Sequence, residues 1–321
     1  MGTLCRTFSA AVAVTLLAGC AARGPRAAAP QPVPADDAAA GPATYASMSE
    51  FMQKVRQLSV SQRPAAKTAL ETVEMRDPEL AADLQRAAVA PSADLYRAIG
   101  ERYQDHGILD SAYRNFNRAV ALNSRDAAAY EGLARVWRDW GLPELALGDA
   151  QRATFYAPRS ASARNTYGTV MQALGRYRDA TAAYELASRL EPHAAYAVNN
   201  LCYLSFINAQ IDDAIDKCSA ALRLDSSLTA ARNNLALAFA ASGRMDLART
   251  QFLDAGDRAS GLYNSGIAFL AAGDEASALA AFDEASRARA TFNISRERAD
   301  AIRARLGLRA AADRLEHGSR H

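Results

Sequence analysis

The residue pattern between positions 93 and 262 repeats every 34 residues, and this period constrains the fold more than any other feature of the chain. Five segments align without gaps. One column holds a small residue typical of a turn, and two further columns hold only alanine. The columns are Gly107, Gly141, Gly175, Ala209, Gly243; then Ala112, Ala146, Ala180, Ala214, Ala248; then Ala119, Ala153, Ala187, Ala221, Ala255. A period of this length predicts one helix pair per unit, stacked so that neighbours bury each other's apolar faces.

This pattern resembles the tetratricopeptide repeat. The segment 127–160 carries nearly the whole of that family's pattern, in Tyr130, Leu133, Ala134, Trp137, Gly141, Ala146, Ala153 and Pro158. The resemblance implies an all-α, right-handed superhelical solenoid of about six helix pairs with helical caps. The expected units are 93–126, 127–160, 161–194, 195–228, 229–258 and 259–290, which together span 93–290. The sixth fits after a shift of four residues, with Gly266, Gly273, Ala278, Phe282 and Ala285 as landmarks, and the loop 256–261 is expected to carry the deletion.

Segments without repeat landmarks flank the array. Residues 45–92 contain three expected helices, Met48 to Leu58, Arg63 to Met75 and Pro78 to Val89, which we interpret as an N-terminal cap. A second capping helix is expected over 291–307, because Asn293 can cap it and an apolar stripe follows. Residues 308–321 are expected to form a flexible tail.

The amino terminus reads as a targeting signal. Arg6 precedes an apolar run that is too short to span a membrane. The residues Leu17-Ala18-Gly19-Cys20 resemble the lipobox of bacterial lipoproteins, which implies removal of residues 1–19 and lipidation of Cys20. An ordinary secretory signal is the alternative. Ala21 favours an outer-membrane lipoprotein facing the periplasm, and the Ala- and Pro-rich segment 20–44 reads as a lipidated, disordered tether.

Composition and motifs argue against several classes of function. The net charge of +2 comes from dispersed Lys, Arg, Asp and Glu, so no basic stripe predicts nucleic-acid binding. The four histidines form no metal-ligand pair, and neither a nucleophile elbow nor a phosphate-binding glycine loop occurs. We therefore expect no catalytic activity, no metal and no cofactor.

In tetratricopeptide proteins the first helix of each repeat lines a concave groove, so the resemblance implies which side chains point inward. One pair of inward positions holds Glu101 and Gln104, Arg135 and Arg138, and Thr169 and Gln172 in the first three repeats. The later repeats hold Tyr203 and Phe206, Leu237 and Ala240, and Ile267 and Leu270. The groove is therefore expected to change from polar to apolar at the fourth repeat, and an exposed apolar strip marks an interaction surface.

Asparagines recur beside these positions. The complete set expected to line a groove for a protein or peptide partner is Asn165, Tyr196, Asn199, Asn200, Tyr203, Phe206, Ile207, Asn233, Asn234, Leu237, Asn264, Ile267 and Leu270. Amide side chains can bond the backbone of an extended peptide in both directions. Two alternatives remain open: the asparagines belong to the structural pattern of the repeat, and the aromatic residues are buried by the chain's own C-terminal segment.

Cys202 and Cys218 remain in the folded part after the signal is removed and Cys20 is lipidated. They occupy facing positions on the two helices of one repeat. We favour core packing of two small side chains there, and a disulfide is the alternative in an oxidising compartment.

Lipid anchor, tether and repeats together resemble the pilotin-like lipoproteins of type IV and Tad-type pilus and secretion systems. That resemblance implies a membrane-anchored scaffold whose partner is a secretin or another pilus component. The alternatives are an adaptor that docks cell-wall hydrolases or synthases, and a structural envelope protein that self-associates as a homodimer.

Overall fold

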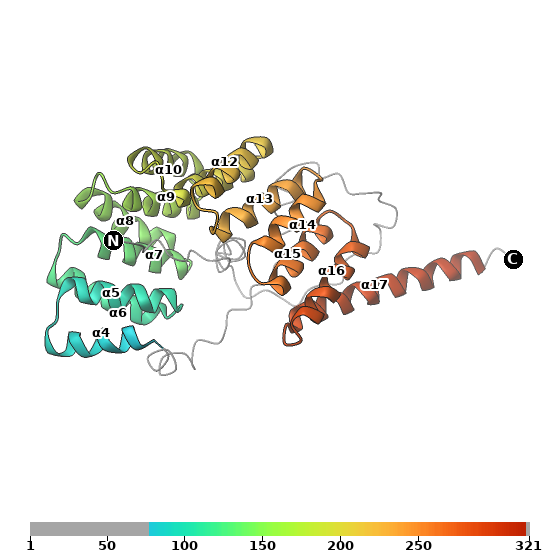
Figure 1. The fold of residues 1–321 in the computed structure, drawn as a ribbon, viewed down its shortest axis with the longest axis horizontal. Coiled ribbons are helices and arrows are strands. Elements are labelled where there is room, and N and C mark those ends of the chain that lie inside the picture. Colours follow the sequence, from blue (N-terminus) through green and yellow to red (C-terminus); the bar gives the residue numbers. More distant parts are fainter. Residues whose placement is uncertain (1–76, 319–321) are drawn as a thin grey trace. The chain divides into compact units, whose positions relative to one another are not determined.

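The computed structural model describes residues 77–318, with side chains described through residue 307. Its helices form an ordered series of pairs (Figure 1). The helices are α4 (Pro78–Val89), α5 (Ala93–Asp105), α6 (Leu109–Leu122), α7 (Ala127–Asp139), α8 (Pro143–Tyr156), α9 (Ala161–Ala173), α10 (Tyr177–Leu190), α11 (Ala195–Ile207), α12 (Ile211–Leu224), α13 (Thr229–Ala241), α14 (Met245–Asp254), α15 (Arg258–Ala271), α16 (Glu275–Ala288) and α17 (Asn293–Gly318). The predicted all-helical repeat fold is confirmed.

Polar side chains explain where several of the helices begin. The side chains of Ser92, Asp126 and Ser160 accept hydrogen bonds from backbone N–H groups in the first turns of α5, α7 and α9. Asp257 and Asp274 do the same for α15 and α16. These caps satisfy donors that a helix cannot satisfy internally.

The turn inside each helix pair uses a left-handed backbone conformation. Gly107, Gly141, Gly175, Gly243 and Gly273 have φ between 73° and 81°. Ala209 occupies the same turn in the fourth pair with φ 62°, although its Cβ disfavours this region. The turn is therefore set by the stacking of the repeat and not by glycine alone.

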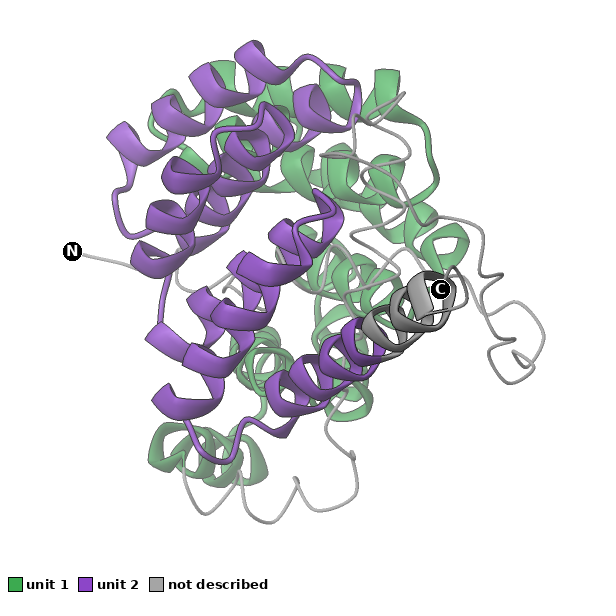
Figure 2. Cartoon of the chain, turned by 90° about the vertical axis from the view of Figure 1, so that its right-hand side faces the viewer, with its two compact units in different colours: residues 1–7, 18–28, 61–201 green, residues 8–17, 29–60, 202–321 purple. Residues whose placement is uncertain are grey.

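The chain divides into two compact units, shown in different colours in Figure 2. Among the described residues, unit 1 comprises 77–201 and unit 2 comprises 202–318, so the boundary falls inside α11. Each unit has its own core. Phe116, Ile99 and Val136 are central to the core of unit 1, whereas Leu262 and Phe282 are central to that of unit 2.

Within each unit the first helices of successive pairs contact one another. Helices α5, α7 and α9 form such a series in unit 1, and α13 contacts α15 in unit 2. Second helices pack mainly against first helices, so the first helices lie on the inner side of each stack. This arrangement brings side chains 31 to 35 residues apart in sequence into contact.

The fifth pair is shorter than the others, as expected, but the missing residues come from its second helix and not from the loop that follows. Helix α14 has 10 residues where α12 has 14, and α15 begins at Arg258. Residues 258–261, expected in a loop, form the first turn of α15. Gly261 allows the start of α15 to lie close to the end of α14, because a Cβ at position 261 would lie 2.5 Å from the carbonyl oxygen of Phe252.

The last helix is longer than expected. Helix α17 continues to Gly318, so most of the segment 308–321, expected as a flexible tail, is helical. Residues 308–316 contain neither Gly nor Pro and are rich in Ala, Leu and Arg, which favour helix. Ala299 and Ile302 bury the near half of α17 in the core of unit 2.

Several sequence-based expectations fall outside the described residues. These concern the signal 1–19, the tether 20–44 with Cys20, and the first two helices of the N-terminal cap; the third cap helix is α4. Across the part of the chain that is described, none of the helices combines the length and apolar character required to cross a bilayer.

Candidate functional site

The inner face of unit 1 carries a ladder of polar side chains that bond from one first helix to the next. Gln104 Nε2 on α5 donates to Asp139 Oδ2 on α7 at 3.1 Å, and Arg135 Nε donates back to Gln104 Oε1 at 3.1 Å. One repeat further, Arg138 Nη1 donates to Thr169 Oγ1 on α9 at 3.0 Å. All five side chains are partly exposed, so the ladder can exchange hydrogen bonds with a partner.

The ladder continues into the fourth repeat through two asparagines. Asn200 Nδ2 in the first half of α11 donates to Asn165 Oδ1 on α9 at 2.7 Å. Both side chains keep some exposed surface. One donor of Asn200 and the acceptor of Asn165 are thus used within the fold, although each amide can form further hydrogen bonds.

Glu131 makes another contact between the first helices α7 and α9. Its carboxylate is buried, accepts a hydrogen bond from Ser162 Oγ at the start of α9, and lies 4.0 Å from Arg135 Nη1. Burial raises the pKa of the Glu131 carboxyl, and the Ser162 hydrogen bond and the Arg135 charge oppose that rise. The residue ties α7 to α9.

The inner face of unit 2 differs from the expected exposed strip. Phe206, Leu237, Ile267 and Leu270 are all buried and belong to one core cluster, and Tyr203 is only 4% exposed. Helices α13 and α15 are apolar around most of their circumference, and a helix of that kind is buried on all sides. These side chains therefore stabilise unit 2 in this structure, and a role in partner binding stays a prediction.

Asn233 has an unmet donor inside this buried face. Its side chain is 2% exposed, Asn264 Nδ2 donates to its Oδ1 at 3.5 Å, and its own Nδ2 has no hydrogen-bond acceptor. An unsatisfied buried amide costs about 1–3 kcal/mol. An acceptor placed at this point would be stabilising.

The predicted groove residues thus fall into two groups. Those with exposed surface are Asn165, Tyr196, Asn200, Ile207 and Asn264. Those that are buried are Asn199, Tyr203, Phe206, Asn233, Asn234, Leu237, Ile267 and Leu270. Tyr196 also donates its hydroxyl to Glu191 Oε2 at 3.1 Å, which holds the ring over the end of the third repeat.

The favoured interpretation of the cysteines is wrong. Cys202 on α11 and Cys218 on α12 form a disulfide, with Cα atoms 5.2 Å apart and both residues fully buried. The Cα separation lies within the usual range for a disulfide. Small side chains allow α11 and α12 to approach closely enough at this point.

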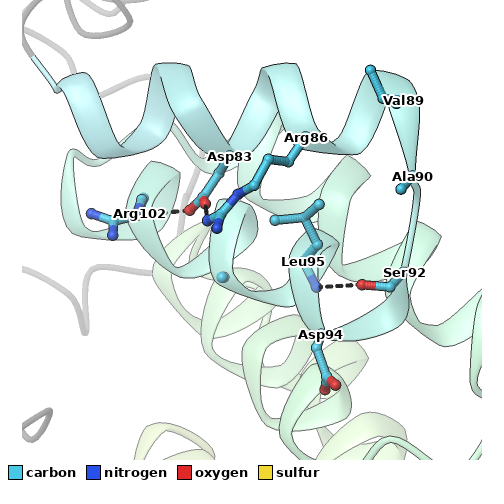
Figure 3. Close-up of a pocket in the computed structure, with 9 residues that line it drawn as sticks. Asp83, Arg86, Val89, Ala90, Ser92, Asp94, Leu95 and Arg102 are labelled. Carbon is cyan, nitrogen blue, oxygen red and sulfur yellow. Dashed lines mark hydrogen bonds and ion pairs between the residues drawn. The ribbon is translucent and has the colours of Figure 1, made fainter.

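A shallow hollow lies between α4 and α5 (Figure 3). Buried Asp83 lies at its base and accepts hydrogen bonds from Arg86 and from Arg102 Nε, the latter at 3.2 Å. Because its charges neutralise one another, this hollow is better explained as the tie between the first two helices than as a ligand site. Among the described residues, no group of His, Cys, Asp and Glu has the arrangement of a metal site.

Sequence reasoning missed the bonds between repeats. Asn200 and Asn165 were each expected to face a partner, yet they bond each other, and Glu131 with Ser162 was not singled out. The two residues of each pair lie close to one period of 34 residues apart in the sequence, at separations of 35 and 31. Complementary polar residues at these separations are the sequence signal that would have predicted both hydrogen bonds.

No family model and no curated protein sequence matches this chain. Solved structures do match its fold. A structure of PilW, titled a widely conserved type IV pilus biogenesis factor, is 18% identical with a TM-score of 0.55, over 65% of this chain and 97% of that one. A tetratricopeptide repeat protein from Parabacteroides merdae is 15% identical with a TM-score of 0.53, over 78% and 99%. The APC/C hetero-tetramer Cut9–Hcn1 reaches a TM-score of 0.60 at 16% identity, over 79% and 53%.

These likenesses concern the path of the backbone, at identities too low to transfer an activity. They agree with the period of 34 residues and with the pairing of the helices. The chain therefore has the tetratricopeptide-repeat fold.

Proposed function

We propose that this protein is a non-catalytic, membrane-anchored scaffold of the bacterial envelope that holds a protein partner during assembly of a pilus or secretion machine. The observation that carries the proposal is the polar ladder across α5, α7, α9 and the first half of α11. Its amide, guanidinium and hydroxyl groups are partly exposed and regularly spaced. An extended peptide offers complementary donors and acceptors at each residue.

Two further points favour a pilus or secretion system. The lipobox-like Leu17-Ala18-Gly19-Cys20 supports an outer-membrane anchor with the repeats in the periplasm. The type IV pilus biogenesis factor PilW shares the fold over nearly its whole length. A secretin or another pilus component is then the proposed partner.

Partner capture from the inner face tests this function. A photo-crosslinking amino acid replaces Asn200 on the inner face in one strain and Ala182, an exposed residue of α10, in a control strain. We expect the Asn200 position to capture a secretin or pilus component that the Ala182 position does not. Cell-wall hydrolases or synthases in its place would favour the adaptor, and crosslinks to a second copy would favour self-association. Equal capture from both positions would contradict the inner-face proposal.

The membrane anchor is tested separately. The Cys20→Ala chain should lose its lipid and appear in the soluble periplasmic fraction, whereas the unmodified chain sediments with outer membranes. Several acyl chains bind a bilayer stably, so the shift should be nearly complete. A Cys20→Ala chain that still fractionates with membranes would remove the lipoprotein claim.

A further inference from the structure

One contact is built the same way in three of the six helix pairs. It joins a position on the first helix to a position on the second, and it consists of a small residue facing a large ring. A Cβ at Gly100 would lie 2.8 Å from the ring of Phe116, and one at Gly168 would lie 2.5 Å from that of Tyr184. The sixth pair repeats the arrangement, with Gly266 against Phe282 at 2.6 Å.

These rings fill the space between the two helices. Phe116, Tyr184 and Phe282 have no exposed surface. Each ring occupies the volume left by the missing side chain on the first helix, so the helices are held by shape complementarity. We call this contact the interlock.

The fourth pair has Cys202 and Cys218 at the two interlock positions. A second Cys side chain provides much less volume than Phe or Tyr, so it cannot fill the space in the same way. The disulfide spans these positions and both sulfurs are enclosed. A covalent bond therefore lies where the first, third and sixth pairs have a ring.

The second pair has Ala134 and Ala150 at these positions, and both are fully buried. Phe116 of the preceding repeat contacts α7 at a different position, because a Cβ at Gly132 would lie 2.4 Å from its ring. The second pair therefore packs two small side chains against each other, whereas the fourth pair joins its two small side chains by the disulfide.

We propose that the Cys202–Cys218 disulfide is a folding lock that replaces the interlock of the fourth repeat, so that the stability of unit 2 depends on oxidation of these two thiols. Because both residues are fully buried, the bond is set while the chain folds and is protected from reductants afterwards. A lock of this kind ties the finished fold to an oxidising compartment. The inference does not depend on the identity of any partner.

The redox step is thiol–disulfide exchange with an oxidant of the dithiol–disulfide class. One cysteine thiolate attacks the oxidant's disulfide and forms a mixed disulfide. The second thiolate then attacks the sulfur of the first, which forms the Cys202–Cys218 bond. Two electrons and two protons pass to the oxidant, which leaves as a dithiol.

Thermal unfolding of four samples tests the lock. Each sample is the full chain with Cys5→Ser and Cys20→Ser, so that Cys202 and Cys218 are the remaining cysteines of the reference chain. The four are this reference chain, the same chain reduced during unfolding and refolded in reductant, Cys202→Ala/Cys218→Ala, and Cys202→Gly/Cys218→Phe. The last variant restores the interlock residues of the first and sixth repeats. Alkylation of free thiols followed by mass measurement establishes the redox state of each sample.

Two optical signals separate the units. The chain has two tryptophans, Trp137 and Trp140, and both lie in unit 1, so their fluorescence reports on that unit. Circular dichroism reports on helices of both units. We expect the reduced chain and the alanine pair to unfold in unit 2 on the order of 10 °C lower than the oxidised chain. The fluorescence transition should move much less.

The glycine–phenylalanine variant should recover most of that loss and should be insensitive to reductant. An alanine pair as stable as the oxidised chain would overturn the proposal, because the bond would then contribute nothing. A glycine–phenylalanine variant no more stable than the alanine pair would overturn the equivalence of disulfide and interlock. Free thiols in the oxidised, folded reference chain would also contradict the lock.

Discussion

At the scale of single residues, Ala209 is unusual because it adopts a left-handed conformation that glycine adopts at the same turn of the other helix pairs. Its φ of 62° matches the turn glycines, and the residue is exposed. The strain is therefore one of backbone conformation and involves no packing. Residue type and backbone geometry disagree at this one turn.

Ala209→Gly should therefore stabilise the protein. Relief of the left-handed strain is worth about 1 kcal/mol after the greater flexibility of glycine in the unfolded chain is subtracted. Chemical denaturation followed by circular dichroism measures the gain. The matched control is Gly243→Ala, the same turn one repeat later, where no atom lies within 4 Å of the added Cβ and a similar loss is expected. A destabilised Ala209→Gly protein would contradict this explanation of the turn.

At the scale of helices, the stack is held by ties between first helices as well as by the apolar core. The period places Gln104 near Arg135, Arg138 near Thr169, and Asn165 near Asn200. Each tie joins neighbouring repeats of unit 1. The tie through Glu131 differs from these because its charge is buried.

Glu131→Gln should change how stability depends on pH. Burial raises the pKa of Glu131 above its unfolded value of about 4.5, so between these two pKa values the folded chain binds more protons than the unfolded chain. The contribution of this group to stability is greatest below the unfolded pKa and is lost as pH rises through the folded pKa. Gln keeps an acceptor for Ser162 without a charge. The variant should therefore gain stability relative to the natural chain as pH is raised from 4 towards 7.

Unfolding curves measured at several pH values check this sign. Parallel pH dependences for the two proteins would show that the carboxyl of Glu131 is as well solvated when folded as when unfolded. A relative loss of stability at neutral pH would instead show that the charge, through Arg135, stabilises the tie between α7 and α9.

At the scale of the whole molecule, one repeat array contains two compact units with separate cores, and the boundary lies within α11. The inner faces of the two units also differ in polarity and exposure. That of unit 1 is polar and partly exposed, whereas that of unit 2 is apolar and buried. Partner binding is therefore expected first at unit 1.

Ile302→Ala tests whether the units unfold separately. Ile302 on α17 is 1% exposed and belongs to the core of unit 2, so the cavity should cost about 2–5 kcal/mol. The circular dichroism transition should shift, while the tryptophan fluorescence of unit 1 should change little. The neighbouring Arg303→Ala, whose exposed side chain pairs with Asp283, should change the stability much less and serves as the control. Equal shifts of both signals would indicate a single cooperative unit.

The sequence by itself determined the class of fold. Its period of 34 residues, the columns of alanine and the turn glycines require paired helices, because only small residues allow two helices to approach at those points. It also placed Cys202 and Cys218 on facing positions. The sequence did not predict the first turn of α15, because Gly261 suggested a loop, whereas it allows a close contact between helices. It did not predict the extension of α17 either, because the residues of a chain end carry only local signals.

Tertiary structure alone decided which inward positions stay open. Tyr203 and Phe206 were expected on an exposed strip and are buried, because an apolar side chain contributes most to stability where water is excluded. Asn165 and Asn200 bond each other, since the stacking of repeats brings their amides within 2.7 Å. Oxidation of the cysteine pair likewise depended on how closely α11 and α12 approach. Period and residue type specify the pairing of helices, but exposure, bonding and covalent linkage depend on distances that only the folded stack sets.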